Sequence, residues 1–220
     1  MMKSGFLFDL DGVIVDTAKY HYIAWRYIAN KAGFDISDEF NEKLKGISRM
    51  ESLEKILDYG HQSDMYSREE KILLADEKND YYVKLLGELS EKNILPGVRD
   101  FIIQANRLNI PCAVASASRN APFILKKLNI DNYFKAIVDP ALLNKGKPDP
   151  EIFLKAASSV NVLPQDAIGF EDAESGITAL NRAGIFSVGV TGEHSLLTGA
   201  DLIISSFEDI TPEYILKIKE

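Results

Sequence analysis

Hydrophobic residues follow two different rhythms along this chain. Between residues 17 and 90 they recur at helical spacing, and two capping signals fall in the same region, Ser48 with Glu51 and Ser67 with Glu70. Before and after that region, short continuous apolar runs alternate with helical stretches. Continuous runs are typical of strands that are buried on both faces of a sheet. The pattern therefore predicts an all-helical segment inserted into an α/β series.

The expected elements follow from these runs and from the residues that end them. Gly33, Gly60 and Gly184 end helices, and Pro150 stands in a first helical turn, where its missing N–H costs nothing. Strands are expected at 5–9, 112–116, 136–138, 167–171, 186–190 and 202–205, and helices at 17–32, 48–60, 67–90, 97–108, 120–128, 150–160 and 173–183, with one more near the carboxyl end. Strands that alternate with helices predict a parallel sheet with right-handed crossovers.

These elements predict two domains in one α/β protein. We expect a doubly wound, Rossmann-like parallel-sheet core, formed by residues 1–15 and 93–220, with an inserted small helical cap domain at 16–92. Two linkers, near 13–16 and 89–96, would join the cap to the core. A chain of 220 residues is long enough for one large domain or for a core with such an insert.

Composition and net charge limit the kinds of binding partner and the cellular compartment that we expect for this protein. The net charge of -8 does not suggest a nucleic acid or an anionic membrane as partner, so an anionic substrate would need a local cationic site or a metal. The single cysteine, Cys112, excludes an internal disulfide, fits a reducing compartment and is expected to pack in the core. Neither a signal peptide nor a membrane-spanning apolar run is visible, and we expect a cytoplasmic protein.

Polar side chains gather where the expected strands end. Asp9 ends the first strand, Ser116 ends the second, Glu171 and Asp172 follow the fourth, and Lys147 stands just before a helix. In an open parallel sheet, ligands bind outside the carboxyl ends of the strands. Residues that are far apart in the sequence are therefore expected along one edge of one sheet.

The acidic residues in this group predict a metal site. In an extended chain the side chains of Asp9 and Asp11 point the same way, and Gly12 would let the backbone turn away. A lone pair of this kind is more often a solvated turn, but Glu171 and Asp172 would bring four carboxylates together. Their mutual repulsion calls for a cation, and oxygen ligands favour Mg²⁺.

A phosphate site is expected beside the acids. Ser116 contributes a hydroxyl, the residues that follow it contribute backbone N–H groups at a helix start, and Lys147 contributes a positive charge. An isolated lysine is more often a surface residue, but here it lies in the run KPDPEIF.

Four motifs in order make the chain resemble the haloacid dehalogenase-like superfamily of phosphotransferases. They are DLDGVIVDT, VASAS, KGKPDPEIF and GFEDAESGI, and they span the predicted core. The helical insertion after the first strand is similar to the subgroup with a small helical cap, and the cap segments resemble those of a sugar-phosphate mutase. The family motif has one basic residue before its proline. Here Lys145 and Lys147 are both present, and we assign the role to Lys147, which directly precedes Pro148.

The resemblance implies roles for the core residues. Asp9 would be the nucleophile that becomes phosphorylated, and Asp11 would be the general acid and base. The implied cofactor is Mg²⁺, held by Asp9, by the backbone carbonyl of Asp11 and by Asp172, with Glu171 in its coordination or beside it. The implied phosphate-binding residues are Ser116, Ala117, Asn120 and Lys147.

In the cap, the resemblance implies contacts to the substrate. Arg49 is the candidate for a second phosphate because a guanidinium fork suits that group, although a cap arginine is otherwise more often a surface residue. Thr17, His21 and Trp25 are spaced by four and share one helical face, which would aid cap closure, with His21 coupled to Asp11. Packing within the cap is the alternative for this face; for His21 we favour the functional role, and for Trp25 the two are balanced. The other implied substrate-binding residues are Lys45, Gly46, Ser48, Ser52 and Lys78.

The resemblance implies a phosphotransferase that interconverts β-D-glucose 1-phosphate and glucose 6-phosphate, and this is the function that we expect. It would act through an aspartyl-phosphate and a β-glucose 1,6-bisphosphate intermediate. The alternative is an Mg²⁺-dependent sugar-phosphate or phosphoglycolate-type phosphatase, in which water attacks the aspartyl-phosphate because the cap does not exclude it.

Two further classes are disfavoured. A non-catalytic binding module would not need the intact set of acids, and a dehalogenase would leave Glu171 and Asp172 unexplained. The expected partner is a small sugar phosphate, and we expect a monomer because the cap must move.

Overall fold

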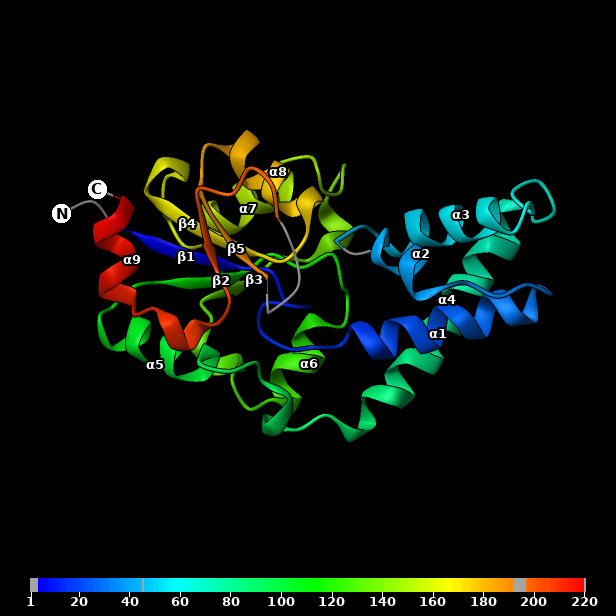
Figure 1. Cartoon of the computed structure of the whole chain (residues 1–220), viewed down its shortest axis with the longest axis horizontal. Helices are drawn as coiled ribbons and strands as arrows, with labels where there is room; N and C mark the ends of the chain where they lie inside the picture. Colours follow the sequence, from blue (N-terminus) through cyan, green and yellow to red (C-terminus); the bar gives the residue numbers. More distant parts are fainter. Residues whose placement is uncertain (1–3, 45, 192–196, 220) are drawn as a thin grey trace. The chain divides into compact units, whose positions relative to one another are not determined.

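The computed structural model describes residues 4–44, 46–191 and 197–219 (Figure 1). The chain divides into two compact units. We call Met1–Asp16 with Leu89–Glu220 the core unit and Thr17–Glu88 the cap unit. Asp16 and residues 89–92, which the sequence pattern assigns to the cap, group with the core unit.

The core unit is built on a six-stranded sheet in the order β3-β2-β1-β4-β5-β6. The strands are β1 (Gly5–Phe8), β2 (Cys112–Val114), β3 (Ala136–Ile137), β4 (Ala167–Glu171), β5 (Phe186–Val190) and β6 (Leu202–Ile204). Every neighbouring pair is parallel. The order reverses between β1 and β4, which is the topological switch point where doubly wound sheets bind ligands. The predicted fold class is confirmed.

Helices cover both faces of this sheet. In Figure 1, α7 and α8 lie on one side and α5 and α9 on the other. The helices of the core unit are α5 (Val98–Arg107), α6 (Ala121–Lys127), α7 (Glu151–Ser159), α8 (Glu174–Ala183) and α9 (Pro212–Lys219). A strand that is buried on both faces must be apolar at every position, which explains the continuous runs in the sequence.

Strand β1 illustrates this double burial. Leu7 packs in the apolar cluster that includes residues of α7 and α8. Its neighbours Phe6 and Phe8 contact other aromatic rings instead, among them Phe101 of α5 and Phe170 of β4. Burying a side chain of this size contributes about 1.5–3 kcal/mol. The strand that carries Asp9 is therefore firmly held in the middle of the sheet.

In its described residues, 17–44 and 46–88, the cap unit consists of helices joined by turns and loops and contains no strand, as predicted. Its α-helices are α1 (Ala18–Lys31), α2 (Asp38–Glu42), α3 (Arg49–Tyr59) and α4 (Arg68–Leu85). Trp25 and Ile28 of α1 pack with Leu53 and Ile56 of α3 in one apolar cluster. This cluster gives the cap a hydrophobic core of its own.

Both predicted capping signals begin helices of the cap unit. The Ser67 box is complete, because Ser67 Oγ accepts from the Glu70 N–H and the Glu70 carboxylate accepts from the Ser67 N–H. At Ser48 the structure shows one half of the predicted box, in which Ser48 Oγ accepts from the Glu51 N–H at 3.3 Å.

The two predicted linkers lie side by side within the core unit. Val15 and Ile94 form an antiparallel bridge, and the Leu95 N–H donates to the Ile14 carbonyl at 2.9 Å. Pairing the segments in this way satisfies backbone groups where the chain enters and leaves the insertion.

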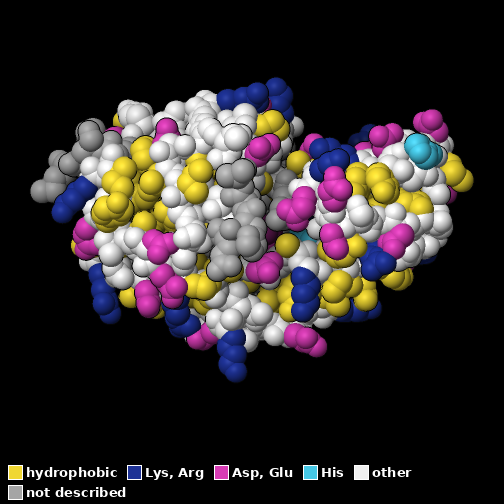
Figure 2. Space-filling view, viewed as in Figure 1, with side chains coloured by type: hydrophobic (Ala, Val, Ile, Leu, Met, Phe, Trp, Pro, Cys, Tyr) yellow, Lys and Arg dark blue, Asp and Glu magenta, His cyan; other side chains and the backbone are white. Residues whose placement is uncertain are grey.

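The surface carries charges of both signs. On the face drawn in Figure 2, acidic and basic side chains are interspersed. Within the described residues, no helix is both long enough and apolar enough to span a bilayer.

Candidate active site

The site begins where β1 ends. The strand stops at Phe8, and the Asp9 N–H donates to the Phe170 carbonyl of β4 at 3.0 Å, which ties Asp9 to the neighbouring strand. A bend follows at Leu10, whose carbonyl accepts from both Ile14 and Val15. This bend replaces the extended chain that we expected here. The shared direction of the Asp9 and Asp11 side chains therefore stays a prediction.

A buried ion-pair network joins Asp9 to β4. Lys147 Nζ lies 2.5 Å from Asp9 Oδ1 and 2.5 Å from Glu171 Oε1. The side chains of Lys147 and Glu171 are fully buried, and that of Asp9 is 7% exposed. Lys145 is 74% exposed and lies 3.8 Å from Asp149. The geometry thus supports Lys147, rather than Lys145, as the basic residue of the site.

Burial and charge act in opposite directions on this network. Burial alone would lower the pKa of Lys147, but the charges of Asp9 and Glu171 outweigh it and raise that pKa. Burial raises the pKa of Glu171, while Lys147 acts to lower it. The ammonium group therefore stays charged and offers a fixed positive charge beside Asp9.

Two glycines make room for the acids at the end of β4, Glu171 and Asp172. A Cβ at Gly176 would lie 1.9 Å from Glu171 Oε1, and a Cβ at Gly12 would lie 2.0 Å from Asp172 Oδ2. Gly12 also has φ +80°, in the left-handed region that favours glycine. The Asp172 carboxylate therefore packs directly against the backbone turn that follows Asp11.

The predicted phosphate-binding residues follow β2, the neighbour of β1 on its other side. Phe8 pairs with Val114, so Ser116 lies one residue past the level of Asp9. Ser116 is 1% exposed, and its Oγ accepts from the Ser118 N–H at 3.1 Å. Asn120 is the N-cap residue of α6. The loop that contains Ala117 thus connects the end of β2 to a helix start, as expected for this group.

The candidate metal ligands near the switch point are carboxylate and carbonyl oxygens, which are the ligand atoms that a hard cation prefers. The structure brings the Asp172 carboxylate against the turn that carries the Asp11 carbonyl. In the described part of the chain, no three His, Cys, Asp or Glu side chains form a group that could hold a metal ion. The four carboxylates of Asp9, Asp11, Glu171 and Asp172, which we expected to come together, therefore do not form such a group. The metal assignment stays a prediction.

A second cationic group lies inside the cap unit. Lys78 is 2% exposed, and its Nζ lies 2.9 Å from His21 Nδ1 and 4.5 Å from the centre of the Trp25 ring. An ammonium can only donate, so Nδ1 accepts and the imidazole proton resides on Nε2. Burial, followed by the charges of Lys78 and Arg49, lowers the pKa of His21. The imidazole is therefore neutral, and its buried Nε2 has no hydrogen-bond partner among the described residues.

Arg49 belongs to the same group. Its Nη2 donates to Asn79 Oδ1 at 2.7 Å, and its Nη1 lies 3.6 Å from Asp76 Oδ1. Ser52 is 3% exposed and donates to the Ser48 carbonyl at 3.0 Å. Sequence reasoning missed Asn79, because its position beside Lys78 is the only local signal and is not specific.

The structure shows where most of the remaining predicted cap residues lie, and their roles toward a substrate stay predictions. Thr17 is fully buried at the N-cap position of α1, and Trp25 both packs in the cap's apolar cluster and receives the Lys78 ammonium on its ring. Gly46 has φ +73°, as a turn before α3 requires. Lys45 lies outside the described residues. The predicted coupling of His21 to Asp11 stays a prediction.

Comparison with known proteins agrees with this geometry. The sequence profile of the haloacid dehalogenase-like hydrolases matches residues 3–184. The chain belongs to this family, and the family prediction is confirmed.

Within the family, the similar proteins include some that are named mutases and some that are named phosphatases. The β-phosphoglucomutase of Bacillus subtilis (strain 168) is 47% identical over 209 residues, covering 95% of this chain and 92% of the relative. The phosphorylated carbohydrates phosphatase of Thermotoga maritima is 30% identical over 216 residues, covering 96% of each. The crystal structure of β-phosphoglucomutase from Clostridium difficile superposes with a TM-score of 0.95 at 48% identity, covering 100% of this chain and 97% of the other.

Proposed function

We propose that this enzyme is a β-phosphoglucomutase, which interconverts β-D-glucose 1-phosphate and glucose 6-phosphate. The observation that carries this is the presence of two separate cationic groups. Lys147 lies beside Asp9 in the core unit, while Lys78 and Arg49 lie beside a neutral His21 in the cap unit. An enzyme that holds a sugar bisphosphate needs two anion sites, whereas hydrolysis of a monophosphate needs one. The high identity to proteins named β-phosphoglucomutase supports the same conclusion.

The reaction proceeds through two displacements at phosphorus. Asp9 takes the 1-phosphoryl group of β-glucose 1,6-bisphosphate, which releases glucose 6-phosphate, and then passes it to the 6-hydroxyl of β-glucose 1-phosphate, which forms the bisphosphate again. A carboxylate oxygen of Asp9 attacks phosphorus, and the bond from phosphorus to the sugar oxygen breaks. Asp11 gives its proton to that leaving oxygen. In the second displacement, Asp11 removes the proton of the incoming sugar hydroxyl, which attacks the aspartyl-phosphate and restores the Asp9 carboxylate. Lys147 offsets the charge of the transferring phosphoryl group throughout.

Mg²⁺ is the cofactor that these residues suit. Asp9, Asp172 and the backbone carbonyl of Asp11 would hold it, with Glu171 close by. When bound, the ion neutralises phosphoryl oxygens and aligns them with the nucleophile.

Hydrolysis is the second candidate, because a 30% identical relative is named a phosphatase. Both reactions share the aspartyl-phosphate, and they differ in whether water or a sugar hydroxyl attacks it.

One assay separates the two reactions. The purified protein is incubated with Mg²⁺, β-glucose 1-phosphate and a trace of β-glucose 1,6-bisphosphate, and both products are measured. Glucose 6-phosphate without free phosphate is the expected result. Stoichiometric free phosphate would instead show that the protein is a phosphatase. The absence of both products would contradict both candidate functions.

Chelation tests the metal assignment separately. We expect EDTA to abolish turnover and added Mg²⁺ to restore it. Mg²⁺ should also raise the thermal unfolding midpoint of the wild-type protein, because a ligand that binds only the folded state stabilises it. The Asp172→Asn variant should lose most of that shift. An equal shift in both proteins would contradict the assignment of Asp172.

A further inference from the structure

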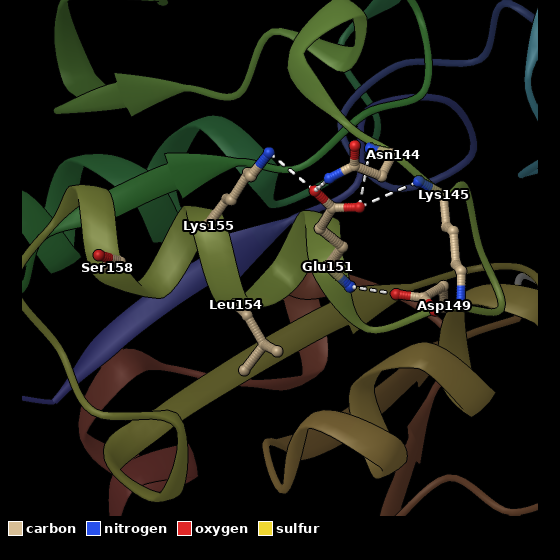
Figure 3. A pocket seen from close by; sticks show the side chains of 7 residues that line it. All are labelled: Asn144, Lys145, Asp149, Glu151, Leu154, Lys155 and Ser158. Carbon is tan, nitrogen blue, oxygen red and sulfur yellow. Dashed lines mark hydrogen bonds and ion pairs between the residues drawn. The ribbon is translucent and has the colours of Figure 1, made fainter.

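The loop that delivers Lys147 to the site is held from outside by one carboxylate. Figure 3 shows Glu151, in the first turn of α7, within a surface pocket that includes Asn144, Lys145 and Lys155. Glu151 Oε2 accepts from the backbone N–H groups of Asn144 and Lys145, at 2.9 and 3.0 Å. Its Oε1 accepts from the Asn144 side-chain amide at 3.1 Å and from Lys155 Nζ at 2.8 Å. One side chain thus fixes the two residues that lie just before Gly146 and Lys147.

The electrostatic state of Glu151 suits this task. The hydrogen bond from Lys155 and then that from the Lys145 backbone lower the pKa of Glu151 to about 2. The carboxylate is therefore ionised, and able to accept from all these donors, at any pH near neutrality.

Other contacts hold the same loop at its two ends. Lys155 Nζ donates to the Leu142 carbonyl, and Arg182 Nη1 donates to the Pro148 carbonyl at 3.1 Å. Between those ends, the backbone N–H groups of Asn144 and Lys145 donate to Glu151. The fully buried side chain of Lys147 then reaches Asp9 and Glu171. A loop that is fixed on both sides of Lys147 allows little freedom to its ammonium group.

We propose that Glu151 is a positioning residue for Lys147. It does not touch the reacting atoms, and it acts by fixing the backbone from which Lys147 extends. The consequence for turnover rests on the proposed function, whereas the consequence for the placement of Lys147 does not. An acidic residue that merely favours a helix N-terminus would affect stability alone.

Two variants and a labelling measurement test the proposal. Glu151→Ala removes every acceptor, and Glu151→Gln keeps one side-chain oxygen at the same length. Lysines are acetylated with a water-soluble amine reagent in the full-length protein, and the rate at Lys147 is followed by peptide mass spectrometry. Lys126, which is exposed on α6, serves as the internal reference. Glu213→Ala, at an exposed acid in the first turn of α9, is the matched control.

We expect acetylation of Lys147 to rise at least about tenfold in Glu151→Ala, because a loop that has lost the contacts of Glu151 opens more often and exposes the amine. Turnover should fall by about 10- to 100-fold. Glu151→Gln should show the same changes to a smaller extent, and Glu213→Ala should show neither.

Protection of Lys147 at the wild-type level in both Glu151 variants would overturn the proposal, even if turnover fell. If Glu151→Ala does not fold, Glu151→Gln decides by the same criterion. If the wild-type protein has neither mutase nor phosphatase activity, the proposed function fails, and the labelling rates alone decide whether Glu151 positions Lys147.

Discussion

Removal of Lys147 should disturb the buried ion-pair network strongly. Its ammonium compensates two buried carboxylates, and a substitution would leave Asp9 and Glu171 together without it. We expect Lys147→Ala to lower the free energy of unfolding by about 3–5 kcal/mol, since breaking a buried pair leaves an uncompensated charge. Urea unfolding measures this. Lys145→Ala, at a side chain that is 74% exposed, should change stability by less than about 0.5 kcal/mol. Equal effects would contradict the role of burial.

The pH dependence of this stabilisation has a defined sign. The pKa of Lys147 is raised in the folded protein, so its contribution is fully present below the usual lysine value of 10.5. That contribution is lost only as the pH rises through the higher folded value. Across the neutral range it should stay constant.

Cys112 should be chemically inert in the folded protein. It is fully buried in β2, and burial raises its pKa to about 12, so almost no thiolate exists near neutral pH. We expect no reaction with a thiol-specific chromogenic reagent at pH 8 under native conditions, and reaction of the single thiol in denaturant. Rapid labelling of the folded protein would contradict the placement of Cys112.

At the level of single residues, the sequence predicts which side chains stand at strand ends but not which of them touch. Asp9 and Glu171 follow from apolar runs that stop at an acid. That Lys147 lies between them does not follow, because 138 and 24 residues separate it from its partners and no local pattern encodes that contact. Its assignment depended on the resemblance of the KGKPDPEIF run, and the geometry supports it.

Among the elements, helix α4 depends on a complete capping box. We expect Ser67→Ala to cost about 1 kcal/mol of unfolding free energy, because it removes the acceptor for the Glu70 N–H. Ser67→Asp should preserve stability, since aspartate caps equally well. Thermal and urea unfolding measure both variants. A loss as large in Ser67→Asp as in Ser67→Ala would show that the cap contact is not responsible.

Glu70, the second residue of this capping box, makes the stability of the helix depend on pH. The hydrogen bond from the Ser67 backbone, followed by that from its side chain, lowers the pKa of Glu70. A lowered carboxyl pKa stabilises the folded state above the unfolded value and loses that effect as the pH falls through the folded value. The advantage of wild type over Glu70→Gln should therefore be present at neutral pH and shrink in acid.

The sequence predicts elements well where hydrophobic burial alone determines them. The run Gly5–Phe8 is apolar because helices cover both faces of the sheet, so its place as a central strand could be read directly. The bend at Leu10 could not, since it depends on hydrogen bonds that return from Ile14 and Val15. Hydrophobic periodicity carries no information on such bonds. The same limit applies to Glu151, whose partners are set by the path of a loop.

At the scale of the whole molecule, the cationic side chains of the proposed site belong to two different units. The core unit contains Asp9 and Lys147, and we expect transfer from a small phosphoryl donor to need only residues of this unit. A sugar bisphosphate carries a second phosphate, which we propose is bound by Arg49 and Lys78 of the cap unit. Changing the cap cation should therefore affect the two reactions unequally.

The Arg49→Ala variant tests whether the cap cation affects the mutase reaction and the phosphorylation of Asp9 unequally. We expect its mutase turnover to fall by about 10- to 100-fold, because the second phosphate loses a directed partner and the sugar is misplaced. Phosphorylation of Asp9 by acetyl phosphate, followed by intact mass, should stay within about twofold, since that donor has no sugar to orient. Arg26→Ala is the matched control, because Arg26 pairs with Asp35 and its side chain is 49% exposed, against 22% for Arg49. A parallel loss of both reactions in Arg49→Ala would mean that the cap acts through general folding, and a loss of neither would remove Arg49 from the substrate site.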